Sequence, residues 1–137
     1  MNKFNAKRVK TVDGTFDSKR EYKMWLDLKD TQEKGLIKNL KRQVSFLLIP
    51  KQIGERQVEY VADFVYIIDN TIMDMGEKIL IVADLKSKIT AKDSTYIIKR
   101  KLFKYNYITN KAPKLIEKQT GFKIGEDYDR IIFQEIL

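Results

Sequence analysis

Two stretches, VEYVADFVYII at residues 58–68 and KILIVADLK at residues 78–86, decide the fold class. Both are rich in β-branched and aromatic residues, and turn signals around Gly54 and at residues 70–76 bound them, which is typical of strands. Strands that follow one another along a chain are usually neighbours in the sheet. The two stretches therefore predict adjacent strands of one sheet.

The residues before these strands predict a helix and a further strand. A capping box at residues 18–21, SKRE, begins a helix that continues toward Gly35, a natural C-terminal stop. Apolar residues then alternate with period two at Val44, Phe46 and Leu48, which predicts a strand.

The residues after the two strands predict two helices and a closing strand. A basic helix is expected to begin near Asp93 or Ser94 and to run to about Tyr107. Pro113 is expected to open a short helix, and residues 130–137, RIIFQEIL, are expected to form the last strand. The order αβββαβ, with the short helix added, predicts a mixed α+β fold, of the α/β class, with a central sheet of four to five strands flanked by helices.

Composition limits the number of domains and the chemistry. The chain has 137 residues, of which 43% are hydrophobic, so we expect one domain at residues 15–137 after a flexible basic arm at residues 1–14. The sequence has no run of about 18 apolar residues, and its start lacks the apolar stretch of a secretory signal, so we expect a cytoplasmic protein with no membrane partner. The chain contains no cysteine and no histidine, which excludes disulfides, Ser-His and Cys-His hydrolases and zinc sites built on those residues. Catalysis must therefore use carboxylates, lysines, hydroxyls or an oxygen-ligated metal.

The charge balance favours a polyanionic partner. Lysine and arginine number 27 against 19 acidic residues, a net charge of +8, and nucleic acid is the leading candidate partner. Four cations of the predicted basic helix are candidates for phosphate contact: Lys99, Arg100, Lys101 and Lys104. The alternative is that these charges only solvate one face of the helix.

Asp63 is a carboxylate among aliphatic residues. Strand alternation puts it on the same face as Val61, Val65 and Ile67. Burying a carboxylate in such a place costs on the order of several kcal/mol unless a cation, a metal or hydrogen-bond donors compensate its charge. The alternative is an aspartate near a sheet end that only accepts bonds from backbone amides.

Asp84 and Lys86 form a D-x-K motif at the end of the next strand, so their side chains point the same way. Asp63 can lie across from Asp84, and two carboxylates with nearby oxygen ligands are what Mg²⁺ or Mn²⁺ requires. The lysine can hold a water or a developing phosphate charge. The alternative is an ordinary ion pair at a strand end.

Glu21 is the third candidate carboxylate. It lies on the helical face that should pack toward the sheet, because Trp25 and Leu28 follow it four and seven residues later. As the last residue of the capping box, Glu21 can equally be only a helix cap. The two roles can coexist.

These residues in this order resemble the PD-(D/E)XK nuclease superfamily, which includes restriction enzymes and Holliday junction resolvases. More narrowly, four segments resemble small phage-encoded nuclease-like proteins: 16–21 (FDSKRE), 60–66 (YVADFVY), 82–86 (VADLK) and 99–103 (KRKLF). Two residues depart from the pattern, since Ala62 replaces the proline of the superfamily name and Ser87 stands where glycine is expected.

The resemblance implies a restriction-endonuclease-like fold and a metal-dependent active site. It implies that Asp63, Asp84 and the Leu85 carbonyl bind Mg²⁺ or Mn²⁺, that Glu21 supports or completes the site, and that Lys86 orients the attacking water. The catalytic residues would then be Glu21, Asp63, Asp84 and Lys86.

The resulting hypothesis is an endonuclease selective for branched DNA, of the Holliday junction resolvase type, acting in phage recombination or replication in the host cytoplasm. A non-catalytic DNA-binding accessory module that keeps the nuclease fold is the alternative, followed by a general or sequence-specific restriction-type nuclease. Resolution of a junction needs two cuts, so we expect a homodimer. Surplus apolar residues in the basic helix, Phe103, Tyr105, Tyr107 and Ile108, would form its interface unless they fill the monomer core.

Overall fold

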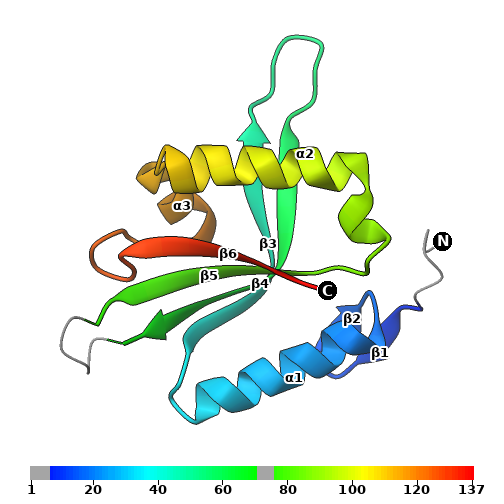
Figure 1. Cartoon of the computed structure of the whole chain (residues 1–137), viewed down its shortest axis with the longest axis vertical. Coiled ribbons are helices and arrows are strands. Elements are labelled where there is room, and N and C mark those ends of the chain that lie inside the picture. Colours follow the sequence, from blue (N-terminus) through cyan, green and yellow to red (C-terminus); the bar gives the residue numbers. More distant parts are fainter. Residues whose placement is uncertain (1–6, 71–75) are drawn as a thin grey trace.

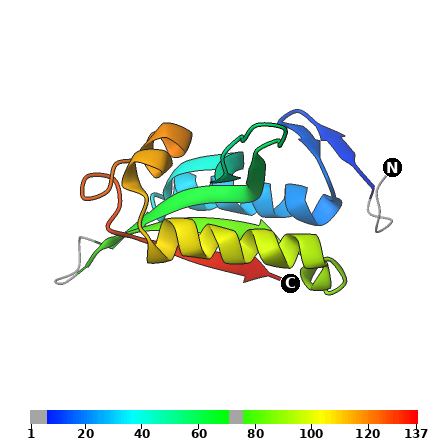
Figure 2. The same ribbon diagram turned by 90° about the horizontal axis from the view of Figure 1, so that it is seen from above.

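A computed structural model describes residues 7–70 and 76–137 of the chain. Figures 1 and 2 show a twisted sheet with helix α1 on one face and helices α2 and α3 on the other. The elements in chain order are β1 (Val9–Thr11), β2 (Gly14–Phe16), α1 (Lys19–Glu33), β3 (Lys38–Ile49), β4 (Val58–Asp69), β5 (Lys78–Leu85), η1 (Thr90–Lys92), α2 (Ser94–Phe103), η2 (Lys104–Thr109), α3 (Pro113–Thr120) and β6 (Arg130–Ile136). This confirms the predicted mixed α+β class, the four-stranded mixed sheet and the short helix at Pro113. None of the helices in the described ranges is long and apolar enough to cross a membrane.

The central sheet has the order β3-β4-β5-β6. The first three strands are antiparallel, and β6 returns after the helices to lie parallel to β5. Most of the turn predicted at residues 70–76 lies outside the described residues. The predicted neighbours β4 and β5 are paired, from Asp69 with Lys78 to Phe64 with Ala83.

Each face of the sheet has its own hydrophobic cluster. Helix α1 packs on one face, where Trp25 stacks on Phe64 with ring centroids 6.2 Å apart. On the other face Phe103 and Tyr107 pack against Phe46 of β3. Phe103 and Tyr107 are four residues apart on one helical face, and both stay buried where α2 continues into the π-helical turn η2.

The packing of α2 buries most of the apolar residues that were predicted to form the homodimer interface. Phe103 and Tyr107 are completely buried in the monomer core, and Ile108 is half-buried against it. Only Tyr105, which is 60% exposed, remains at the surface. The aromatic residues of this helix therefore mainly fill the core of one copy.

The alternation of β4 breaks beside Asp63, which corrects the position predicted for Val61. Residues on both sides of Asp63 contact the α2 side although their numbers differ in parity: Tyr60, Ala62, Val65 and Ile67. Val61 is 44% exposed instead of joining them. On the neighbouring strand Gln43 stands between two paired positions and has a φ of 53°. This irregular step lies beside Asp63 and aims its carboxylate toward the end of β5.

The N-terminal boundary also differs from the prediction. Residues 9–16, which overlap the predicted flexible arm at 1–14, form the antiparallel hairpin β1–β2. The Arg42 guanidinium holds this hairpin to β3, because it donates to the Thr15 carbonyl at 2.7 Å and lies 3.7 Å from the centre of the Phe16 ring. Residues 1–6 of the arm lie outside the described residues.

Candidate active site

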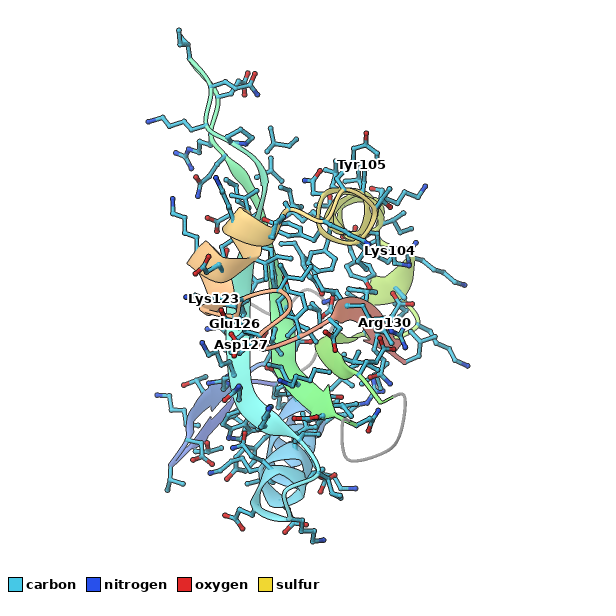
Figure 3. The ribbon with its side chains drawn as sticks, turned by 90° about the vertical axis from the view of Figure 1, so that its left-hand side faces the viewer. Lys104, Tyr105, Lys123, Glu126, Asp127 and Arg130 are labelled. Atoms are coloured by element: carbon cyan, nitrogen blue, oxygen red, sulfur yellow. The ribbon has the colours of Figure 1, made fainter. Side chains whose placement is uncertain are left out.

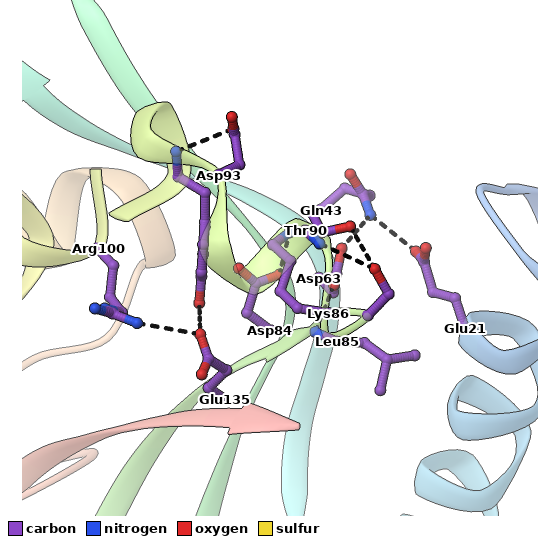
Figure 4. A network of polar contacts seen from close by, with 12 residues as sticks. Glu21, Gln43, Asp63, Asp84, Leu85, Lys86, Thr90, Asp93, Arg100 and Glu135 are labelled. Atoms are coloured by element: carbon purple, nitrogen blue, oxygen red, sulfur yellow. Dashed lines mark hydrogen bonds and ion pairs between the residues drawn. The ribbon is translucent and has the colours of Figure 1, made fainter. Parts of the chain in front are cut away.

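The three predicted acidic residues meet where the pairing of the two central strands, β4 and β5, ends. Asp63 lies on β4, Asp84 lies near the end of β5 and Glu21 lies in the first turn of α1 (Figure 4). The β4–β5 pairing ends at Phe64 with Ala83, and one more step of the same register sets Asp63 opposite Asp84. All three side chains are buried.

Asp63 ties the end of β5 to β4. One carboxylate oxygen, Oδ2, accepts from the Leu85 backbone N–H at 2.8 Å, and Oδ1 accepts from Gln43 Nε2 at 3.4 Å. Burial and the neighbouring Asp84 carboxyl raise the pKa of Asp63 to about 7, although the Leu85 amide opposes the shift. The described contact of Leu85 uses its amide, so the metal-binding role of its carbonyl stays a prediction.

Asp84 has no exposed surface. Its Oδ1 accepts from Lys86 Nζ at 3.0 Å, whereas its Oδ2 has no hydrogen-bond partner within residues 7–70 and 76–137. The Tyr60 hydroxyl is also buried, and its interaction with the Asp84 carboxyl is too poorly aligned to count as a full hydrogen bond. Burial, the Asp84 charge and this side-chain interaction raise the pKa of Tyr60 above its usual range, so the hydroxyl stays protonated beside Asp84. A buried carboxylate oxygen without a donor is costly, and a bound cation is one group that removes the cost.

Lys86 is held on two sides. Its ammonium pairs with Asp84 and lies 4.9 Å from the centre of the Tyr96 ring, which attracts a cation. The Tyr96 hydroxyl donates to Glu135 of β6, which also accepts from Arg100 Nη1 at 3.4 Å (Figure 4). The Lys86 ammonium is therefore held by the Asp84 carboxylate and by a tyrosine ring whose hydroxyl is bound to Glu135.

Glu21 is linked to Asp63 through Gln43. The Gln43 amide donates to Glu21 Oε1 at 3.0 Å and to Asp63 at 3.4 Å (Figure 4). Burial raises the pKa of Glu21 to about 7, with further contributions from the Asp63 and Asp17 carboxylates. The Glu21 backbone N–H still donates to Ser18 Oγ at 3.1 Å, so the helix cap forms as well.

A cavity of about 380 Å³ opens over this cluster. It is lined by Asp17, Ser18, Arg20, Glu21, Asp63, Leu85, Lys86, Ser87, Ile89 and Thr90. Arg20 leans across it and donates to the Lys86 carbonyl at 3.4 Å. The cavity lining therefore combines carboxylates with the cations Arg20 and Lys86. The carboxylates suit an oxygen-ligated metal, and the cations suit a phosphate group.

The donor set fits a divalent cation at two of the three acidic residues. Within the described ranges, no group of three or more acidic side chains lies in an arrangement that could hold a metal. Asp63 and Asp84 supply hard carboxylate oxygens, including the buried Oδ2 without a partner, and such ligands suit Mg²⁺ or Mn²⁺. Glu21 is connected to Asp63 through the Gln43 side chain, so it is placed to orient a metal ligand.

The four cations predicted to bind DNA do not share one face of α2. Lys99 lines a hollow beside the β3–β4 hairpin, and Arg100 pairs with Glu135 near the site. Lys104 projects toward β6, where its ammonium lies 5.4 Å from the centre of the Phe133 ring (Figure 3). Lys101 is exposed. Phosphate contact by this set stays a prediction, and it would involve more than one surface.

Sequence reasoning missed Gln43, Tyr60, Tyr96 and Glu135 as parts of the site. Tyr96 lies on the basic helix that the sequence predicts, and its ring belongs to the site because the Lys86 ammonium lies over it. Gln43 gives no local signal, since its position depends on an irregular step in β3. Glu135 lies on the last strand, whose parallel pairing with β5 sets it level with Asp84.

The comparisons with known proteins give one match. A family model described as "Protein of unknown function (DUF1064)" matches residues 1–122. No curated protein and no solved structure matches the chain.

Proposed function

The chain belongs to the DUF1064 family, and we propose that it is a divalent-metal-dependent DNA endonuclease of the PD-(D/E)XK type. The observation that carries the proposal is the Asp84 carboxylate, buried at a strand end with one oxygen bound by Lys86 and the other without a partner among the described residues. A structural ion pair would bury only one acid. Here Asp63 lies beside Asp84, and two crowded carboxylates are costly unless a proton or a cation compensates them, which a divalent metal would do.

The residues have distinct roles in the proposed hydrolysis. Asp63 and Asp84 would hold Mg²⁺ or Mn²⁺, which when bound would supply positive charge against the negative charge that develops on the phosphate. Lys86 donates from Nζ to the attacking water or to a phosphate oxygen, and it is kept in place by Asp84 and the Tyr96 ring. Glu21 orients Asp63 through Gln43.

The proposed substrate is branched DNA, as in a Holliday junction resolvase of a phage. The net charge of +8 supports a polyanion, and cutting both strands of a junction requires two active sites related by symmetry. We therefore propose a homodimer, although the burial of Phe103 and Tyr107 leaves its interface without the support expected from the sequence. The proposed setting is phage recombination or replication in the host cytoplasm.

A non-catalytic DNA-binding module is the second candidate, and one observation favours it. The Gln43 amide lies between Glu21 and Asp63, where it partly satisfies both carboxylates without a metal. A general or sequence-specific nuclease would share the site and differ only in substrate.

The test is a cleavage assay on four substrates: a four-way junction, a flap, a single strand and a linear duplex. The wild-type protein is expected to cut with Mg²⁺ or Mn²⁺ and to prefer the junction, and a chelator should stop the reaction. Binding without cleavage under every metal condition would support the non-catalytic module instead. Equal cleavage of all substrates by a monomer in sedimentation would leave a general nuclease.

A further inference from the structure

We infer that the hollow between the β3–β4 hairpin and α2 is a second binding surface for the DNA backbone, separate from the carboxylate site. The inference rests on the proposed function, since it takes DNA as the partner. Beyond that function, it identifies the surface that would hold a part of the DNA away from the cut.

The hairpin that borders the hollow is closed by a tight turn. Gln52 and Glu55 exchange two backbone hydrogen bonds of 3.2 and 3.1 Å around Ile53 and Gly54. The φ of 77° at Gly54 is one that glycine adopts without strain, so the turn keeps its shape. Figures 1 and 3 show the hairpin rising past α2 and standing clear of the rest of the molecule. Ile53 at its tip is fully exposed.

The hollow has a volume of about 530 Å³, and its lining has more positive than negative charges. Three cations from separate parts of the chain line it: Lys51 and Arg56 on the hairpin and Lys99 on α2. The one acidic residue in its lining, Glu59, already accepts from Ser45 Oγ at 2.8 Å and from Gln57 Nε2. The lining therefore carries three positive charges against one negative charge, and the Glu59 oxygens are bound by neutral donors, which leaves a net positive charge for an anion from solution.

The distance from the carboxylate site shows which part of the DNA this surface would reach. Val61, at the near end of the hollow, is two residues from Asp63, and Arg56, at its far end, is seven residues away. At roughly 3.3 Å per residue the lining therefore extends from about 7 Å to at most about 23 Å from the site. A DNA strand rises by about 3.4 Å per nucleotide, so the far end corresponds to roughly seven base pairs. The hairpin cations Lys51 and Arg56 therefore contact the backbone of an arm several base pairs from the cut, and the Ile53 tip is placed to enter its groove.

The test compares two variants with the same loss of charge. The first carries Lys51→Gln, Arg56→Gln and Lys99→Gln; the control carries Lys23→Gln, Lys114→Gln and Lys118→Gln, which lie on α1 and α3. Binding is measured with Ca²⁺ to four-way junctions whose arms have about 5 or about 15 base pairs, lengths on either side of the predicted reach. The salt dependence is measured for each pair, and cleavage is measured separately with Mg²⁺.

On long arms, the first variant is expected to lower the salt slope by up to about 2.7, so that between about 50 and 200 mM salt the wild type loses up to roughly forty-fold more affinity. On short arms the first variant should differ from the wild type much less than on long arms, because short arms do not reach Lys51 and Arg56. The control should keep the wild-type dependence on arm length. Ile53→Ala should weaken binding to long arms without changing the slope, whereas Leu36→Ala, another exposed apolar residue, should not.

Equal slopes for the two triple variants, or no DNA binding by the wild type, would overturn the inference. Cleavage with equal slopes would refute this surface and leave the nuclease proposal standing. Binding that depends on arm length, without cleavage in any metal, would support this surface and refute the nuclease proposal.

Discussion

Asp63→Asn should make the metal-free protein more stable at pH 8 and leave its stability nearly unchanged at pH 5. In the native protein the pKa of Asp63 is raised to about 7 from an ordinary value of 3.8, chiefly by burial. Between these values the folded state binds more protons than the unfolded state. The contribution of Asp63 to stability is therefore full below about pH 4, falls as the pH rises through 7 and stays low above it.

The size of the effect follows from the shift and from the hydrogen bonds that asparagine can replace. A shift of roughly three units corresponds to about 4 kcal/mol at pH 8. Asparagine removes this cost, but its single carbonyl can accept from only one of the Leu85 amide and the Gln43 side chain. The unmade bond costs about 1–3 kcal/mol. The net gain at pH 8 is therefore about 1–3 kcal/mol, a rise of roughly 3–10 °C in Tm.

The assay is thermal or urea unfolding of the wild type and the variant at pH 5 and pH 8 with a chelator, repeated with Mg²⁺. Asp27→Asn, the same change at an exposed position of α1, is the control and should not differ from the wild type. Mg²⁺ should stabilise the wild type at pH 8 and the Asp63→Asn protein less, because ligand binding to the folded state raises stability. An Asp63→Asn protein that is less stable than the wild type at pH 8 would refute the assigned electrostatic cost.

Three further predictions concern the lysine, its support and the core. Lys86→Ala should lower the cleavage rate at least about 100-fold while Mn²⁺ binding, followed by titration, persists; loss of metal binding would contradict its role. Tyr96→Phe should keep more activity than Tyr96→Leu in single-turnover cleavage at matched thermal stability, because only the ring contacts Lys86; equal activity would remove Tyr96 as a positioning residue. Phe103→Ala should cost about 3–5 kcal/mol in urea unfolding while Tyr105→Ala costs less than about 1 kcal/mol, since only Phe103 is fully buried; similar costs would contradict the packing of α2.

The parts of the fold that depend on local pattern could be predicted from the sequence. The apolar strand ending in Asp84 and Lys86, the helix cap at Ser18 and the short helix at Pro113 each have a signal within a few residues, and the structure has each of them. The opposition of Asp63 and Asp84 followed from the pairing of consecutive strands.

The parts that depend on tertiary contacts could not be predicted in this way. The prediction that Val61 shares the face of Val65 and Ile67 was wrong, because β4 breaks its alternation where β3 has its irregular step at Gln43. The role of Gln43 as a bridge, and that of Glu135 under Tyr96, arise only when distant strands meet. The π-helical turn that follows Phe103 has no local sequence signal either.

Single-turnover cleavage of a four-way junction by the wild type and by Asp84→Asn tests the central claim most directly, with DNA binding measured on the same samples. Asparagine keeps the shape of the side chain but removes the charge that would hold a divalent cation. We expect Mg²⁺-dependent cleavage by the wild type, and from the Asp84→Asn protein undiminished binding with no detectable cleavage. Equal cleavage by both proteins, or none by a folded wild type with either Mg²⁺ or Mn²⁺, would contradict the account.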